Sequence, residues 1–133
     1  MKRVILADTG PLYAAVDPDD GHHKRAQREI KRLARENAEV AIAYPTLLET
    51  YTLVLFRLGV KVASVWLNDI LIGATLLNPT PQDYRDAVIR LLDLPDQPLT
   101  LFDATVAVLA SRLDIEVWTY DHHFDVMRAA VWR

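Results

Sequence analysis

The sequence contains no cysteine. This absence excludes disulfide bonds, thiolate metal sites and cysteine nucleophiles together, and it is compatible with a reducing compartment. No apolar run is long enough to span a membrane. The run that follows the basic start Met1-Lys2-Arg3 ends at Asp8, which is too early for the core of a signal peptide. We therefore expect a cytoplasmic protein.

The chain also has little excess charge, because 15 Lys and Arg residues stand against 18 Asp and Glu residues, for a net charge of -3. Taken alone, this balance argues against a nucleic-acid partner. If four of the acids share a metal ion, however, the other charged residues nearly balance, so the net charge excludes no partner. With 133 residues, of which 51% are hydrophobic, the chain fits one globular domain that spans 1–133.

An apolar stretch near the start of the chain ends on a carboxylate and leads into a helix. Residues 4–7 are apolar without polar alternation, as in a strand buried on both faces of a parallel sheet. Asp8 follows this strand, Gly10 permits a tight turn, and Pro11 suits the first position of a helix. Ligands of open α/β sheets bind beyond the carboxyl ends of the strands, so we expect Asp8 to face a site.

Helix and strand patterns alternate along the rest of the chain. The expected helices are 12–16, 23–37, 46–59, 60–72, 80–92 and 100–113, and the later strands are 40–44, 74–77, 115–120 and 129–132. This alternation predicts an α/β fold with a mainly parallel central β-sheet of about five short strands, flanked by helices and joined by right-handed crossovers.

Three further acids are expected at the same edge of the sheet as Asp8. Asp121 ends another strand, Asp103 heads the helix that leads to that strand, and Glu49 lies in the first turn of the helix after the second strand. Parallel strands place all of these positions at their carboxyl edge. The alternative for Glu49 is a capping box with Thr46, and the alternative for Asp103 is a helix-capping acid. One shared site explains all four acids with a single assumption.

Four ionised carboxylates repel one another unless a cation neutralises them. All-oxygen ligands select a hard ion, Mg²⁺ or Mn²⁺, and Mg²⁺ binds through a few carboxylates together with substrate phosphate. Such an ion orients and deprotonates a water for in-line attack on a phosphodiester. The pattern therefore predicts metal-dependent phosphodiester hydrolysis, with these four residues as ligands and catalytic groups.

The acidic motifs resemble those of the PIN-domain nucleases, and within them the single-domain VapC-like toxins of bacterial and archaeal toxin–antitoxin pairs. Segments 8–12, 45–49, 103–107 and 119–124 look like the four family motifs in order, with Tyr120 where a basic or small polar residue is commoner. The resemblance spans nearly the whole chain. It implies a Mg²⁺- or Mn²⁺-dependent endoribonuclease that forms a homodimer and binds a cognate antitoxin. Secondary site candidates are Thr9, Thr119 and Asp125, and no role is assigned to Asp17 or Asp20.

Two surfaces are candidates for binding partners. The helix at 23–37 has a basic outer face, formed by Lys24, Arg28, Lys31, Arg32 and Arg35. A charged outer face is ordinary for a surface helix, so a solvated face is the first interpretation and contact with RNA phosphates the second. The segment 47–58 is apolar nearly all round, and Val62, Trp66 and Ile70 follow it. This excess predicts an interface with a second copy and with the antitoxin.

Several other activities fit the sequence less well. A phosphotransferase of the haloacid dehalogenase type needs a second aspartate where this chain has Gly10, and a response-regulator receiver domain needs an acidic pair and a late lysine that are absent. Ser64 and Ser111 fall within expected helices and not at a nucleophile elbow. The histidine pairs 22–23 and 122–123 could suggest zinc, but adjacent histidines in loops are more often exposed. The alternative functions are a degenerate PIN-like RNA- or protein-binding module and a different Mg-dependent phosphohydrolase.

Overall fold

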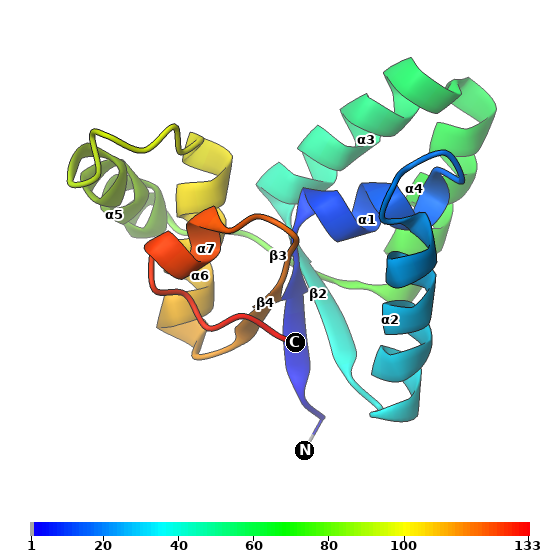
Figure 1. Cartoon of the computed structure of the whole chain (residues 1–133), viewed down its shortest axis with the longest axis horizontal. Coiled ribbons are helices and arrows are strands. Elements are labelled where there is room, and N and C mark those ends of the chain that lie inside the picture. The colour runs from blue at the N-terminus through cyan, green and yellow to red at the C-terminus, as the bar shows by residue number, and fades with distance from the viewer. Residues whose placement is uncertain (1) are drawn as a thin grey trace.

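The computed structural model describes residues 2–133 (Figure 1). Its elements, in chain order, are β1 Val4–Ala7, α1 Thr9–Val16, α2 His23–Arg35, β2 Glu39–Ala43, α3 Tyr44–Leu58, α4 Val60–Gly73, β3 Thr75–Leu77, α5 Pro81–Leu92, α6 Leu101–Leu113, β4 Glu116–Trp118 and α7 His123–Val126. None of the helices in this part of the chain is long and apolar enough to cross a membrane.

The strands form one parallel sheet in the order β3-β2-β1-β4. Leu6 of β1 stands opposite Ala41 of β2 on one side and Val117 of β4 on the other. The strand β1 is therefore internal to the sheet, and Ile5, Leu6 and Ala7 have no exposed surface. Because neighbouring strands are parallel, their carboxyl ends meet at one edge, as the sequence predicts.

Alternate side chains of β1 face two separate cores. Ile5 and Ala7 pack in one cluster with residues of α1, α2, α3 and α4. Leu6 packs in the other cluster, with residues of α5, α6 and α7. Figure 1 shows the same division, with α1 to α4 on one side of the sheet and α5 to α7 on the other. Successive side chains of a strand point to opposite faces, and both faces of β1 are covered by a core, so every residue of the run is apolar.

The predicted strand at 129–132 is wrong. Within that segment of the described chain, Val131 forms a single bridge to Val117 of β4, so the sheet has four strands where about five were predicted. The segment leaves α7 through Arg128, which has a left-handed φ of 58°. Ala129 then donates its backbone N–H to the carbonyl of Phe124. Val117 donates its N–H to the carbonyl of Ala130 and accepts from the N–H of Trp132, so this segment meets β4 through the two hydrogen bonds of one bridge.

Helix α3 begins at Tyr44, before its predicted start at Thr46. Pro45 fits the first turn, where its missing N–H leaves no helical bond unmade. No side chain makes a capping hydrogen bond at this end, so the alternative interpretation of Glu49, a capping box with Thr46, does not hold. Glu49 lies beyond the first turn and instead accepts a hydrogen bond from Thr9 of α1. Through this hydrogen bond the Glu49 side chain lies at the carboxyl edge of the sheet.

Candidate active site

The four predicted acids line one cleft at the carboxyl edge of the sheet. Figure 1 shows the beginnings of α1 and α3 and the segment between β4 and α7 converging at this edge. The cleft has a volume of about 440 Å³. Its lining residues are Asp8, Thr9, Gly10, Glu49, Asp103, Tyr120, Asp121 and His122. The secondary candidate Thr119 lies directly behind the cleft, because its hydroxyl contacts Asp8.

Asp8 is a buried carboxylate at the end of β1. It is 8% exposed, its backbone N–H donates to the carbonyl of Trp118 at 2.9 Å, and its Oδ2 accepts from the Thr119 hydroxyl at 2.9 Å. Although Asp8 is the N-cap residue of α1, its side chain makes no capping bond. Burial, followed by repulsion from Asp103 and Glu49, raises its pKa to about 7, against the lowering effect of Thr119. The metal-free site therefore disfavours a charge on Asp8.

Asp103 sits in the first turn of α6, and its backbone N–H donates to the hydroxyl of Thr100 at 3.1 Å. Thr100 is therefore the N-cap residue of α6. Burial raises the pKa of the side chain, and Asp121 and Glu49 raise it further, so that together they outweigh the hydrogen bond to Thr100, which lowers it. A carboxylate that only accepted backbone bonds at a helix start would have a lowered pKa.

Asp83 of α5 shows what a capping acid looks like in this protein. It forms a full capping box with Thr80 and accepts two bonds from Arg112, at 2.7 and 2.8 Å. Chiefly because of Arg112, its pKa is lowered. Asp83 and Asp103 share the same spacing from a threonine, yet their environments shift the pKa in opposite directions. The comparison favours a site role for Asp103.

Glu49 reaches the cleft from α3 through a chain of hydroxyls. The Thr9 hydroxyl donates to Glu49 Oε1 at 2.5 Å, and the fully buried Thr50 donates to Thr9 Oγ1 at 3.2 Å. The hydroxyl proton of Thr50 therefore points to Thr9, the hydroxyl proton of Thr9 points to Glu49, and Oε1 of Glu49 is held in place. Thr9, a secondary candidate, links the first and second acidic motifs.

Asp121 lies in the loop after β4, close to two imidazoles. Its backbone N–H donates to Thr119 Oγ1 at 3.0 Å, and Nδ1 of His123 lies 2.9 Å from its Oδ1. Ligand atoms of Asp121, His122 and His123 all lie within 4.8 Å of one another, which no other group of three does in residues 2–133. No three of the four predicted carboxylates lie this close together in the described residues, although Asp103 and Asp121 are near enough for a side-chain hydrogen bond.

The remaining predicted acids lie outside the cleft. Asp125 pairs with Arg133 at 2.6 Å and lines a neighbouring pocket. Asp17 accepts a hydrogen bond from the Tyr13 hydroxyl at 2.6 Å, and Asp20 accepts a backbone N–H within the turn before α2. These contacts belong to turns and surface pairs.

The basic face of α2 divides into two kinds of residue. Arg32 pairs with Glu36 at 3.0 Å and lies 4.4 Å from the ring centre of Trp132, so it holds the last segment of the chain. The other predicted residues, Lys24, Arg28, Lys31 and Arg35, are exposed. The prediction missed Arg25, which lies 4.2 Å from the ring centre of Tyr120 in the cleft wall. The sequence signal for Arg25 was its position four residues before Glu29, which allows an ion pair on the same face of the helix.

Comparison with known proteins gives a family and a fold. The chain matches the PIN domain family over residues 5–130. No curated protein matches it significantly. Among solved structures it is similar to VapC20 from Mycobacterium tuberculosis, described as a sarcin–ricin loop cleaving toxin, with a TM-score of 0.83 and 22% identity over 97% of this chain and 98% of that chain.

Two further solved structures have the same fold. VapBC2 from Rickettsia felis, bound to a DNA fragment from its promoter, gives a TM-score of 0.76 and 14% identity over 98% of this chain and 97% of that chain. FitAcB from Neisseria gonorrhoeae gives a TM-score of 0.69 and 19% identity over 97% and 96%. The predicted resemblance to VapC-like PIN domains is confirmed at the level of fold. Since the family match covers nearly all of its length, the chain belongs to the PIN domain family.

Proposed function

We propose that this PIN domain is a divalent-metal-dependent endoribonuclease and the toxin of a toxin–antitoxin pair. In this proposal residues 1–133 act as one nuclease domain, in the cytoplasm, where RNA is available. The observation that carries the proposal is the cleft in which Asp8, Glu49, Asp103 and Asp121 meet. A cleft lined by acids, with a buried member whose pKa is raised, is suited to a metal ion and to the phosphate groups that such an ion binds.

The side chains of the cleft fit a hard divalent ion. All four acids offer carboxylate oxygens, the donors that Mg²⁺ and Mn²⁺ prefer. Asp8 has a pKa of about 7 in the metal-free cleft, so a cation would stabilise its charged form and relieve the repulsion. PIN-domain nucleases generally use divalent metals. For this chain we propose Mg²⁺ or Mn²⁺, held by Asp8, Glu49, Asp103 and Asp121.

Two threonine hydroxyls orient two of these ligands. Thr119 fixes Oδ2 of Asp8, and Thr9 fixes Oε1 of Glu49, so one oxygen of each carboxylate is held while the other is available to the cleft. Hydrogen bonds of this kind set the position and basicity of metal-binding carboxylates. When bound, the ion supplies an activated water and a counter-charge for phosphodiester hydrolysis.

Exposed apolar side chains on α3 and α4 support a protein partner. Leu48, Phe56 and Val65 are 64%, 81% and 63% exposed. Trp66, predicted to belong to this surface, is only 7% exposed and packs in the core under α4. We propose that part of this two-helix surface forms a homodimer and that a cognate antitoxin covers the rest. The similarity to VapBC2 and FitAcB supports the antitoxin.

The function is tested by cleavage of RNA. The purified protein is incubated with structured and unstructured RNAs in Mg²⁺, in Mn²⁺ and in chelator. We expect cleavage that requires the ion and that Asp8→Asn or Asp103→Asn abolishes, because each change removes a charged ligand and keeps the shape of the side chain. Asp96→Asn, in the exposed loop before α6, is the matched control and should cleave as the wild type does.

The same experiment separates the alternative functions. Cleavage that persists in chelator would contradict the metal mechanism. A protein that binds RNA but neither cleaves it nor takes up metal in a titration would be a degenerate binding module. Hydrolysis of small phosphate esters in place of RNA would indicate a different phosphohydrolase.

A further inference from the structure

A second pocket adjoins the acid cleft. Its volume is about 160 Å³, and it shares Tyr120, Asp121 and His122 with the cleft. It adds two cationic side chains, Arg25 and Arg133. We propose that this pocket, with Arg25 as its main contact, binds the RNA phosphate next to the one that lies in the cleft. The proposal rests on the proposed ribonuclease function, because it names a further contact of the same substrate.

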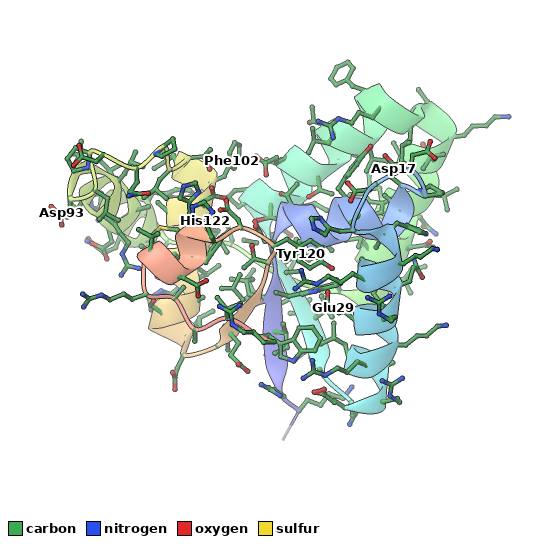
Figure 2. The ribbon with its side chains drawn as sticks, in the orientation of Figure 1. Asp17, Glu29, Asp93, Phe102, Tyr120 and His122 are labelled. Atoms are coloured by element: carbon green, nitrogen blue, oxygen red, sulfur yellow. The ribbon has the colours of Figure 1, made fainter. Side chains whose placement is uncertain are left out.

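Arg25 is held in position by its neighbours. Its guanidinium carbon lies 4.2 Å from the ring centre of Tyr120, and its Nε lies 3.5 Å from Glu29. Glu29 also accepts hydrogen bonds from the Tyr120 hydroxyl, at 2.5 Å, and from the indole N–H of Trp118, at 3.2 Å. In Figure 2, Glu29 lies on α2 with Tyr120 beside it. Because ring and guanidinium are already ordered, a phosphate would bind with little further loss of side-chain entropy.

Arg25 also keeps donors for a ligand. A guanidinium carries five N–H donors, and the ion pair of Arg25 within residues 2–133 uses only Nε. Its side chain is 48% exposed. The two terminal NH₂ groups form the fork that matches two oxygens of one phosphate. The stacked guanidinium can therefore accept a phosphodiester while it stays on the Tyr120 ring.

The charges around the pocket favour an anion beside Arg25. Asp125 is paired with Arg133 at 2.6 Å, so it adds little negative charge. Asp121 is a metal ligand in the proposed function, and Glu29 divides its charge among three donors. The acid cleft itself can hold a phosphate only through a cation. An RNA strand would thus pass from a phosphate neutralised by metal to one neutralised by a guanidinium.

The experiment measures RNA binding without relying on cleavage. A short single-stranded RNA is titrated in Ca²⁺, a hard ion with oxygen ligands, over a range of salt, and gels check that it stays intact. Arg25→Gln is compared with Arg85→Gln, which makes the same change at an exposed position of α5, on the other side of the sheet from α2. We expect Arg25→Gln to reduce the slope of log Kd against log salt by about 0.7, the value for one single-strand phosphate contact, and Arg85→Gln to leave it unchanged. Arg25→Lys, which keeps the charge, should retain most of the slope.

A second measurement locates the phosphate. Each phosphate that flanks the cleavage site is replaced in turn by an uncharged methylphosphonate. One of these RNAs should bind the wild type about ten-fold more weakly, the lower end of the effect of one charge-assisted contact, and should bind Arg25→Gln without a further loss. Equal slopes for Arg25→Gln and Arg85→Gln, or no coupling at either flanking phosphate, would overturn the subsite. Because binding is measured in Ca²⁺, a failure to cleave RNA in Mg²⁺ or Mn²⁺ would count against the proposed function and not against the subsite.

Discussion

We expect Asp8→Asn to stabilise the metal-free protein at pH 8 and to do so less at pH 5. Burial and then repulsion from Asp103 raise the pKa of Asp8 to about 7, from an ordinary 3.8. A carboxyl with a raised folded-state pKa contributes stability that is complete below its unfolded value and is lost as pH climbs through the folded value. Asparagine carries no such charge, and its side-chain oxygen can still accept the bond from Thr119.

The size of the effect follows from the shift of Asp8. A shift of about three pKa units corresponds to roughly 4 kcal/mol in the free energy of unfolding, spread between about pH 4 and pH 8. Roughly 1.4 kcal/mol of this falls between pH 6 and pH 8, because across those two pH units the folded state holds on average about half a proton more than the unfolded state. For a domain of this size that is a change of roughly 5 °C in melting temperature.

The assay compares melting curves of wild type and Asp8→Asn in chelator from pH 5 to pH 8. The difference between the two melting temperatures isolates Asp8, since both proteins share every other titrating group. Asp96→Asn serves as the control for loss of one charge at an exposed position. Excess Mn²⁺ should raise the melting temperature of the wild type much more than that of the variant. If the two curves run parallel from pH 6 to pH 8 in chelator, Asp8 does not carry a raised pKa and the reasoning fails.

Two further changes test the supports of the site and the partner surface. Thr9→Val removes the hydrogen bond to Glu49 and should weaken Mn²⁺ binding by roughly ten-fold in a metal titration. The control Thr52→Val removes a hydroxyl that bonds only within its own helix and should leave the affinity unchanged. Equal affinities of the two variants would show that Thr9 does not support the metal site. Phe56→Ser should shift a dimer toward monomer in sedimentation, because the ring is 81% exposed; an unchanged mass would place the dimer interface elsewhere.

The sequence was sufficient to predict the placement of the site because each acid is tied to a regular element. A buried run without polar alternation sets β1, and its end sets Asp8. In a parallel sheet every helix that leads to or from a strand begins or ends at a known edge, so Glu49 and Asp103 followed from topology alone. None of these steps required knowledge of side-chain contacts.

The errors arose where tertiary contacts override local pattern. Pro45 resembles the end of a strand, but a proline also fits the first turn of a helix, and α3 begins around it. The apolar segment at 129–132 looks like a strand, but it follows a left-handed turn at Arg128 and pairs with β4 only at Val131. Arg25 was missed because a helical face is judged by its charge pattern, whereas its partner Tyr120 lies far away in sequence.

Asp83 and Asp103 give the sharpest test of what such patterns can and cannot show, since both follow a threonine at the head of a helix. Asp83→Asn breaks the pair between buried Asp83 and partly exposed Arg112 and should lower stability by roughly 2 kcal/mol at pH 7. Because the pKa of Asp83 is lowered, its contribution is present above its unfolded value and disappears as pH falls through the folded one, so the loss should shrink in acid. Asp103 has a raised pKa, and Asp103→Asn should raise the metal-free melting temperature at pH 8 and lose this advantage in acid. Mn²⁺ should leave the effect of Asp83→Asn unchanged and reverse that of Asp103→Asn, because the asparagine is a poorer ligand. If both variants melt at a lower temperature than the wild type in chelator and respond alike to Mn²⁺, Asp103 is a capping acid and is not one of the four metal ligands.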